Sequence, residues 1–360
     1  MTHNSPGTRV RIHIPGLPHN DPVRATEYCA FAQRIRRLTT ALHDLGHEVY
    51  LYAGPDSDAS CTEHVEVINF DDRARWFGDE DWTGTVFDRW DPDDPCWADT
   101  NTAIIKAIGE RLEPGDIIGI TAGRCQAAIA DAFPAHVKAE LFAGYEGIMP
   151  DRTHICFESE AWRHYQYGRY GITDGRFFDA VIPNFFHVDE FGLAEKNDYF
   201  LYLGRMTPRK GLPIVAELAR IHPVITAGQG DDRIPYAHHA GVVTGAVKRD
   251  LLARARAVLV PSQYVEPFGG VAVEAMMSGT PVITTDFGAF TETVEHGVTG
   301  FRCRTLAEFR AAVEQIDLLD PAAIRKRAIE RFSTAAAAPL YDSWLGRLAT
   351  LYQRGWYQDG

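Results

Sequence analysis

The sequence has 360 residues, which is enough for two domains that each bury a core of their own. Its formal net charge of −13 argues against nonspecific binding to nucleic acid or to an anionic membrane. No apolar run approaches the roughly 18 residues that cross a bilayer, and residues 1–8 (MTHNSPGT) lack the apolar core of a signal peptide. The six cysteines form no Cys-x-x-Cys pair. We therefore expect reduced thiols, a cytoplasmic location and no membrane insertion.

The chain opens with alternating strand-like and helix-like segments. Residues 10–14 (VRIHI) form a strand-like run with three β-branched residues, and a Gly/Pro-rich loop follows at 15–27. A helical pattern over 28–45 then leads to a second strand-like run at 48–52. This order predicts a parallel α/β sheet. The loop would lie at the carboxyl end of a strand, where ligands bind in such sheets, so its residues are candidate ligand contacts.

Residues 71–99 differ in composition from the segments around them. They hold ten Asp or Glu against three Arg, and four of the chain's seven tryptophans, Trp76, Trp82, Trp90 and Trp97. This composition predicts an irregular insertion that is pinned to the domain by its aromatic side chains. Because tryptophan faces stack well on sugar rings, part of a substrate pocket is the alternative interpretation.

Two further strand-like runs follow at 116–121 (DIIGIT) and 139–142, and the second leads into Gly-Tyr-Glu-Gly at 144–147. Tyr145 and Glu146 would then lie at the ligand-binding edge of the sheet. Glu146 could contact a substrate or take a proton from one, and a structural carboxylate is the alternative.

The βα alternation restarts near residue 199, after a strand-like run at 178–183 (FDAVIP). We therefore predict a first domain over residues 1–190 and a second over 191–335. An amphipathic helix within 336–360 would belong to the first domain.

Two cations follow the run FLYLG, which ends at Gly204. Arg205 and Lys210 would lie just past the carboxyl end of this strand. Arg offers a planar fork to phosphate oxygens and Lys a compact charge, so together they suit a diphosphate. Two solvated loop cations are the alternative.

The EPFGGVAVE segment that begins at Glu266 is more specific. Its glycines permit a tight turn into a helix, and the amides of Gly269, Gly270 and Val271 would form an anion site at the helix start. Glu274 would lie roughly 6–8 Å further along the axis, where its carboxylate can reach a ribose attached to the held phosphates. Both glutamates can accept hydroxyl hydrogens. These groups together suit a nucleotide-activated sugar.

Two glycines near these segments are further candidates. Gly228 ends the strand-like run in 225–232 (ITAGQGDD). It could let the backbone approach a ligand closely, or it could simply form a tight turn. Gly245 lies in 241–247 (GVVTGAV), which could cradle a base through backbone groups. No His, Cys or Asp cluster has convincing metal-ligand spacing, so no metal site is predicted.

These segments resemble retaining glycosyltransferases of the GT-B type, in the family 4-like group that includes sucrose synthase and bacterial mannosyltransferases. The resemblance rests on 181–191 (VIPNFFHVDEF), on 202–212 (YLGRMTPRKGL), and on VPSQYVEPFGGVAVEAMMSGTPVI with the following DFGAFTETVEHGVTGF. It implies two Rossmann-like domains facing across a cleft, with the C-terminal helix crossing back to the first.

The resemblance also implies residue roles. Arg205 and Lys210 would bind the diphosphate, Glu266 the donor sugar and Glu274 the ribose. The donor site would further be lined by Gly204, Phe268, Gly269, Gly270, Val271, Gly228 and Gly245.

The first half matches this family only in pattern. Residues 16–19 (GLPH) replace the family's usual Gly-Gly, and 144–147 (GYEG) occupy the strand end where its donor-contacting histidine stands. Gly16, His19 and Tyr145 are therefore the candidate acceptor contacts, and Glu146 the candidate catalytic group of this half. The half also resembles a subgroup found in bacteriophage and environmental sequences. Because some phage glycosyltransferases modify DNA bases, DNA is among the possible acceptors.

The expected activity is transfer of a sugar to an acceptor hydroxyl with retained configuration, by a metal-independent front-face mechanism. We expect a UDP sugar, from its frequency in the family, no resident cofactor, a glycan or small-molecule acceptor, and a monomer or homodimer in the cytoplasm, or in the host cytoplasm if phage-encoded. Three alternatives stay open: the same chemistry on a hydroxylated base in phage DNA, a nucleotide-sugar epimerase, and a silent nucleotide-sugar-binding protein.

Overall fold

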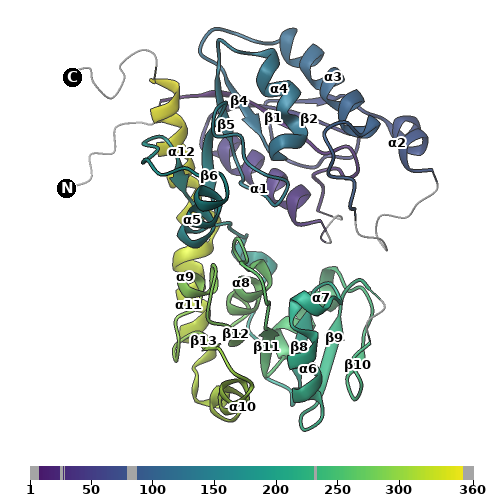
Figure 1. Ribbon diagram of the computed structural model, residues 1–360, viewed down its shortest axis with the longest axis vertical. Coiled ribbons are helices and arrows are strands. Elements are labelled where there is room, and N and C mark those ends of the chain that lie inside the picture. Colours follow the sequence, from purple (N-terminus) through teal and green to yellow (C-terminus); the bar gives the residue numbers. More distant parts are fainter. Residues whose placement is uncertain (1–7, 25–26, 28, 79–86, 231–232, 352–360) are drawn as a thin grey trace. The chain divides into compact units, whose positions relative to one another are not determined.

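The computed structural model describes all residues except 1–7, 25–26, 28, 79–86, 231–232 and 352–360 (Figure 1). The chain divides into two compact units. The first comprises Met1–Phe157, Thr173–Ile182 and Ala337–Gly360, and the second comprises Glu158–Ile172 and Pro183–Ala336.

The first unit is built on a parallel sheet with the order β3-β2-β1-β4-β5-β6-β7. The strands are β1 (Arg11–Pro15), β2 (Glu48–Ala53), β3 (Glu63–Glu66), β4 (Ile117–Ile120), β5 (Val137–Glu140), β6 (His154–Phe157) and β7 (Ala180–Val181). Its helices are α1 (Ala30–Asp44), α2 (Phe70–Phe77), α3 (Pro95–Gly109), α4 (Ala127–Ala132) and most of α12 (Thr334–Ala349). The strand order reverses between β1 and β4, and such a switch point is where ligands bind in doubly wound sheets.

The second unit has a parallel sheet of its own, with the order β10-β9-β8-β11-β12-β13 (Figure 1). The strands are β8 (Phe200–Leu203), β9 (Val224–Ala227), β10 (His238–His239), β11 (Ala257–Val260), β12 (Val282–Thr285) and β13 (Gly300–Cys303). The helices are α5 (Glu160–Arg169), α6 (Leu212–Ala219), α7 (Gly245–Arg254), α8 (Gly270–Met277), α9 (Phe290–Thr293), α10 (Leu306–Gln315) and α11 (Pro321–Phe332). Here the order reverses between β8 and β11, so the loops after these two strands form the switch point.

Side chains of the second sheet alternate between two cores. Leu201, Val258 and Val282 pack with α8 and α11 on one face, whereas Leu259 and Ile283 pack with α6 and α10 on the other. This is the continuous burial expected of a parallel sheet covered by helices on both faces. Because α8 is enclosed between the sheet and α11, the start of α8 is held at a fixed place on the carboxyl edge of the sheet.

The segment that contains α5 groups with the second unit, although the sequence had placed it in the first domain. Contacts with residues far along the chain, in the second unit, hold the start of this segment. Ser159 Oγ donates a 2.7 Å hydrogen bond to the carbonyl oxygen of Pro267, and the Glu292 carboxylate accepts from the backbone N–H groups of Glu160 and Ala161 at 2.8 and 2.7 Å. A carboxylate at a helix start also interacts favourably with the helix dipole.

The C-terminal helix belongs to the first unit for most of its length, as the family resemblance implies. From Ala337 onward the chain belongs to that unit. Trp344 is 1% exposed, and its Nε1 donates a 2.7 Å hydrogen bond to the carbonyl oxygen of Phe178. Tyr341, one turn earlier, is also buried. These two aromatic side chains anchor the helix.

We predict that Trp344→Ala destabilises the protein by about 3–5 kcal/mol, because it removes a large buried ring and leaves a cavity. Leu340→Ala on the same helix, where the side chain is 47% exposed, should cost less than about 1 kcal/mol. Denaturant unfolding of both variants checks the difference. Equal losses would show that α12 is not anchored by its buried face.

Candidate functional site

The start of α8 is shaped by glycine. Gly269 has a left-handed conformation, with φ of 77°, and a Cβ at this position would lie 2.4 Å from a ring carbon of Phe290. Only glycine fits such a place without strain. At Gly270 a Cβ would meet nothing closer than a ring carbon of Phe186 at 3.9 Å, so close packing does not require glycine there. The first amides of a helix lack acceptors inside the helix, and those of Gly270 and Val271 therefore suit an anion.

Glu266 lies immediately before this turn and is 6% exposed. Its Oε1 accepts hydrogen bonds from Ser262 Oγ and Tyr264 OH, both at 2.7 Å, and from Lys210 Nζ at 2.5 Å. Burial alone would raise the pKa of Glu266, but the Lys210 charge and these hydrogen bonds bring the pKa below its usual value. The pKa of Lys210 is raised, since the attraction of Glu266 outweighs the burial of the ammonium group. The two groups form an ion pair at neutral pH.

The loop between β8 and α6 brings further cations to the same place. The backbone N–H of Gln263 donates to the carbonyl oxygen of Arg209 at 2.8 Å, which joins this loop to the one before α8. Arg209 lies over the Tyr264 ring with its Cζ 4.3 Å from the centroid. Arg205 is exposed, and the Tyr202 hydroxyl fixes its backbone by donating to its carbonyl oxygen at 2.6 Å. Sequence reasoning missed Arg209, although it stands next to Lys210.

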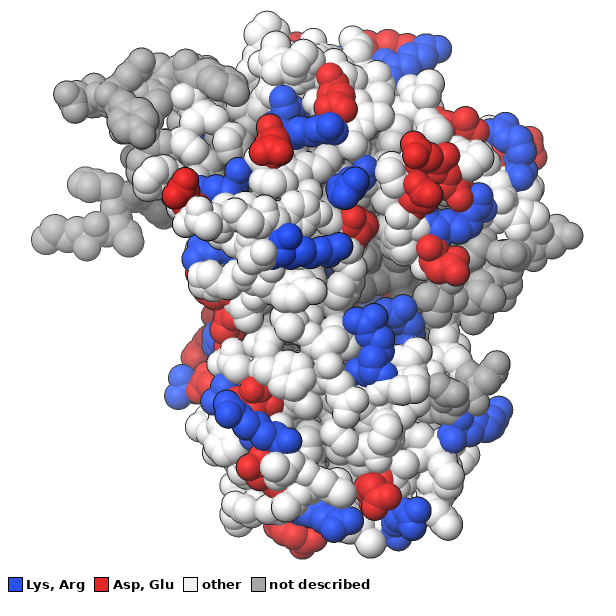
Figure 2. Space-filling view, viewed as in Figure 1, with Lys and Arg blue, Asp and Glu red and all other residues white. Residues whose placement is uncertain are grey.

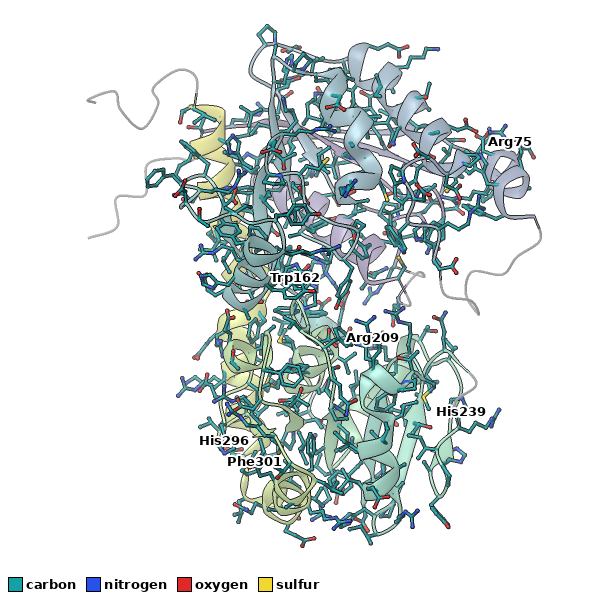
Figure 3. All side chains as sticks on the ribbon, in the orientation of Figure 1. Arg75, Trp162, Arg209, His239, His296 and Phe301 are labelled. Atoms are coloured by element: carbon teal, nitrogen blue, oxygen red, sulfur yellow. The ribbon has the colours of Figure 1, made fainter. Side chains whose placement is uncertain are left out.

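Figure 3 labels Arg209 at this edge of the second unit, and Figure 2 shows Lys and Arg side chains gathered there. The structure therefore brings Lys210 and Glu266 together before the start of α8, with Arg209 on the same loop as Lys210. Arg205 lies on that loop as well, at its beginning. Their contact with a diphosphate and a sugar stays a prediction.

Glu274 lies on α8, one turn beyond its start. Its Oε1 accepts from Lys248 Nζ at 2.8 Å, and the two side chains are 13% and 16% exposed. Lys248 belongs to the first turn of α7, which begins at Gly245 in a left-handed conformation with φ of 57°. No spacing in the sequence links Lys248 to Glu274, because strand β11 and its flanking loops separate them.

The remaining predicted donor contacts have packing roles of their own. A Cβ on Gly228 would lie 1.9 Å from the carbonyl oxygen of Gly204, so close packing of two loops explains this glycine. The ring of Phe268 is 3% exposed and packs edge-on against Phe332 in the core. Any donor contact at Phe268 would therefore come from its backbone.

In the first unit, the loop after β1 is held from both sides. A Cβ on Gly16 would lie 2.8 Å from the carbonyl oxygen of Tyr52, which accepts the Gly16 N–H at 2.6 Å. His19 is 4% exposed and stacks on Phe87 with ring centroids 3.6 Å apart. Burial, and then the charge of Arg73, lower the pKa of His19 to about 3, so the imidazole is neutral. Its Nδ1 has no hydrogen-bond partner in the described part of the chain.

The described tryptophans of the acidic insertion behave as anchors. Trp97 donates from Nε1 to the carbonyl oxygen of Arg89 at 2.8 Å, Trp90 to that of Phe87 at 3.1 Å, and Trp76 to the Asp99 carboxylate at 3.0 Å. Trp82 lies outside the described residues. These three contacts lie within residues 71–99, and the ion pair of Arg73 with Asp21 at 2.7 Å joins the segment to the loop after β1.

Glu146 has unusual chemistry for a carboxyl group. Its Oε1 is shielded from solvent and has no hydrogen-bond partner among the described residues. Burial raises the pKa of Glu146 to about 7, and hydrogen bonds from the backbone N–H groups of Glu146 and Tyr145, together with the nearby charge of Arg34, only partly oppose this. Tyr145 beside it is 43% exposed. A carboxyl with such a pKa can exchange a proton near neutral pH, which fits the catalytic role predicted for it.

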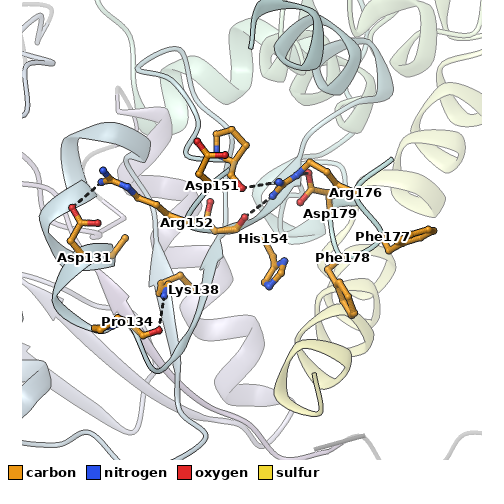
Figure 4. Close-up of a pocket in the computed structure, with 13 residues that line it drawn as sticks. Asp131, Pro134, Lys138, Asp151, Arg152, His154, Arg176, Phe177, Phe178 and Asp179 are labelled. Atoms are coloured by element: carbon orange, nitrogen blue, oxygen red, sulfur yellow. Dashed lines mark hydrogen bonds and ion pairs between the residues drawn. The ribbon is translucent and has the colours of Figure 1, made fainter. Parts of the chain in front are cut away.

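The first unit also contains a pocket of about 540 Å³ (Figure 4). Lys138 and His154, at the amino ends of β5 and β6, line it, so it lies on the edge of the sheet opposite the predicted ligand edge. Its arginines are paired with carboxylates: Arg152 with Asp131 at 2.9 Å, and Arg176 with a neighbouring aspartate at 2.8 Å. This pocket is separate from the candidate site.

Neither a metal-binding cluster nor a membrane-spanning helix is found in the described part of the chain. Within the described ranges, no group of three or more His, Cys, Asp or Glu side chains is arranged to hold a metal ion. Among the helices in the described part of the chain, none has the length and apolarity of a membrane span.

The raised pKa of Glu146 predicts a pH-dependent stability. Folding raises this pKa from about 4.5 to about 7, so the folded state binds the extra proton between these values and its stability falls as pH rises through them. Glu146→Gln removes the ionisation and should stabilise the protein at pH 8 by about 1–3 kcal/mol, shrinking toward zero at pH 5. Denaturant unfolding at both pH values measures this.

The exposed Glu66 supplies the control, since Glu66→Gln should leave the pH dependence unchanged. A Glu146→Gln variant with the same stability difference at pH 5 and pH 8 would contradict the assignment.

Part of the second unit is similar in sequence to known glycosyltransferases. The family model described as "Glycosyl transferases group 1" matches residues 197–317. The glycogen synthase of Mycobacterium tuberculosis is 36% identical over 149 residues, which cover 36% of this chain and 36% of the relative. The chain thus spans a little over a third of the length of this relative.

Solved structures resemble a much larger part of the chain. AviGT4, a glycosyltransferase involved in avilamycin A biosynthesis, matches with a TM-score of 0.67 at 21% identity, over 95% of this chain and 98% of AviGT4. HepE from Anabaena, in its complex with UDP-glucose, matches with a TM-score of 0.65 at 15% identity, over 94% and 99% of the two chains. The prediction of a GT-B fold with two Rossmann-like domains is confirmed. The residues that match the "Glycosyl transferases group 1" model, 197–317, all lie in the second unit of this fold.

Proposed function

We propose that the protein transfers a glycosyl group from a nucleoside-diphosphate sugar to an acceptor hydroxyl, with retention of the anomeric configuration. The observation that carries this proposal is the ionised Lys210–Glu266 pair beside the start of α8, which has no side-chain cap. In this pair, Lys210 is a cation that can bind the leaving phosphate, and Glu266 is a carboxylate that can accept hydrogen bonds from the sugar hydroxyl groups.

The diphosphate is the leaving group, and its charge grows as the bond from sugar to oxygen breaks. Lys210, Arg205 and Arg209 supply cationic donors around it, and the amides of Gly270 and Val271 supply dipolar donors at the helix start. Removing one such stabiliser in an enzyme site typically lowers the rate by about 10²–10³. These groups meet the charge of the leaving group without a metal ion, so we propose a metal-independent reaction.

Glu266 orients the donor sugar by accepting hydrogens from its hydroxyl groups. Three donors already bind its Oε1, and they lower the basicity of the carboxylate. Such a group is a poor nucleophile, which favours a front-face reaction over a covalent glycosyl-enzyme intermediate. In the front-face reaction the departing phosphate accepts the acceptor's proton on the side from which it leaves.

The first unit supplies the acceptor contacts in this proposal. Tyr145 is exposed beside Glu146, whose raised pKa allows it to exchange a proton at neutral pH. The acceptor is a glycan or a small hydroxyl compound. The donor is a UDP sugar, a choice supported by the fold shared with HepE, which was solved with UDP-glucose.

A donor and acceptor screen tests the activity. A ligand that binds the folded state raises the melting temperature, so UDP, GDP and ADP sugars are first compared by thermal shift. Each donor that binds is then incubated with glycan, small-molecule and hydroxylated-base DNA acceptors in the presence of EDTA, and the anomeric configuration of the product is read by NMR.

Each outcome has a defined meaning. Retained product in EDTA supports the proposal. An inverted product or dependence on a metal overturns the mechanism, product on DNA alone overturns the proposed acceptor class, and an epimerised donor without an acceptor indicates an epimerase. Tight donor binding without any conversion indicates a binding protein.

We predict that Lys210→Met and Glu266→Gln each lower kcat by about 10²–10³. Each single change also leaves a buried polar group without its partner and should cost about 3–5 kcal/mol of stability. The double variant Lys210→Met/Glu266→Gln removes both charges and should recover much of the stability while remaining inactive.

Steady-state kinetics and denaturant unfolding separate the two effects. Lys326→Met is the control, because Lys326 is 76% exposed on α11 and forms only a surface pair with Glu330. If activity returned together with stability in the double variant, the pair would be structural and the mechanism would be wrong.

A further inference from the structure

We infer that Lys248 binds the ribose of the donor together with Glu274. The two residues would select ribonucleotide donors over 2′-deoxyribonucleotide donors. This inference rests on the proposed function and adds a specificity-determining residue to it.

The pair joins the first turns of two helices. Lys248 is the fourth residue of α7 and Glu274 the fifth of α8. In a parallel βα sheet both helix starts lie at the carboxyl edge, where the ligand binds. The 2.8 Å contact between Lys248 Nζ and Glu274 Oε1 fixes these two starts beside each other.

The chemistry of the pair complements a vicinal diol. A hydroxyl group both donates and accepts a hydrogen bond, a carboxylate only accepts, and an ammonium group only donates. Lys248 uses one of its three N–H donors on Glu274. Glu274 can then accept from the ribose hydroxyls while Lys248 donates to the oxygen of one of them. If only the carboxylate were present, the ribose hydroxyl oxygens could accept hydrogen bonds only from water.

Partial burial makes the loss of a hydroxyl costly. The two side chains are only 16% and 13% exposed, so water replaces a missing ribose hydroxyl poorly. Sites built to bind a hydroxyl reject analogues that lack it, because their polar groups are left unpaired.

The residues around the Lys248–Glu274 pair indicate how a bound nucleoside diphosphate would be oriented. Val242 and Val247, which flank the start of α7, are 46% and 59% exposed and offer an apolar surface to the face of a base. The amides of Gly270 and Val271 lie at the start of α8, one turn before Glu274. Base, ribose and diphosphate therefore follow one another from the α7 start to the α8 start, with the Lys248–Glu274 pair at the ribose.

Binding of nucleoside diphosphates and their 2′-deoxy counterparts tests this inference. Calorimetry with UDP, GDP and ADP identifies the nucleotide that binds the unaltered protein, and the same measurement with its 2′-deoxy form gives the ribose preference. We expect the unaltered protein to prefer the ribose form by about 10- to 100-fold. Lys248→Met should reduce the preference to about threefold or less, mainly by weakening the ribose form.

Further variants separate recognition from packing. Glu274→Gln should lose the same preference, and the double variant should lose no more than either single one, as expected for groups that act as a unit. Lys248→Arg keeps a donor and should retain part of the preference. Lys326→Met should behave as the unaltered protein. Thermal melts of each variant report folding independently of binding.

The possible failures are distinguishable. If Lys248→Met lowers the melting temperature but leaves the ratio of ribose to deoxyribose binding unchanged, Lys248 is a clamp between helices and the inference is overturned. The same holds if the unaltered protein binds both forms equally. If it binds no nucleoside diphosphate at all, the proposed function itself fails.

Discussion

The buried pair of Lys210 and Glu266 is the constraint on which the candidate site depends. It joins the loop after β8 to the loop before α8, and these are the two loops at the switch point of the second sheet. A buried ion pair is weak evidence for stability, because removing both charges from water costs about as much as their attraction returns. The fold could cover this place with apolar side chains. A charged pair retained at the open end of a helix is better explained by a ligand that carries both phosphate and hydroxyl groups.

Both carboxylates of the Glu-x7-Glu pattern are paired with a lysine, Glu266 with Lys210 and Glu274 with Lys248. The charges of these two pairs cancel within the site. In the proposed function, the net attraction for a diphosphate would therefore come from the exposed Arg205 and Arg209 and from the helix dipole. Lys210 and Lys248 would donate their remaining hydrogen bonds to the ligand. Such an arrangement avoids the cost of an uncompensated buried charge in the empty site.

The sequence was sufficient for the features that depend on local patterns. Parallel βα alternation predicted both sheets, and the glycines before α8 predicted the helix start flanked by Glu266 and Glu274. Pairings between distant segments could not be predicted, because they depend on how loops pack. Lys248 reaches Glu274 only after β11 has brought α7 and α8 side by side. Gly228 was ambiguous for the same reason, since its close neighbour is the carbonyl of another loop. The domain assignment of α5 depended on a carboxylate of α9, far along the chain.

The two carboxyl groups assigned to catalysis have pKa values that move in opposite directions. A lysine and two hydroxyl donors bring the pKa of Glu266 below its usual range against the effect of burial, so it is an anion that can accept hydrogen bonds. Burial raises the pKa of Glu146 to about 7 because it outweighs two backbone hydrogen bonds and the charge of Arg34, so this group can hold or release a proton. Opposite environments for two carboxyl groups are the usual way in which one protein assigns them different tasks. Sequence alone shows two glutamates beside glycines, and only the partners around each carboxylate distinguish the group that binds hydroxyls from the group that can move a proton.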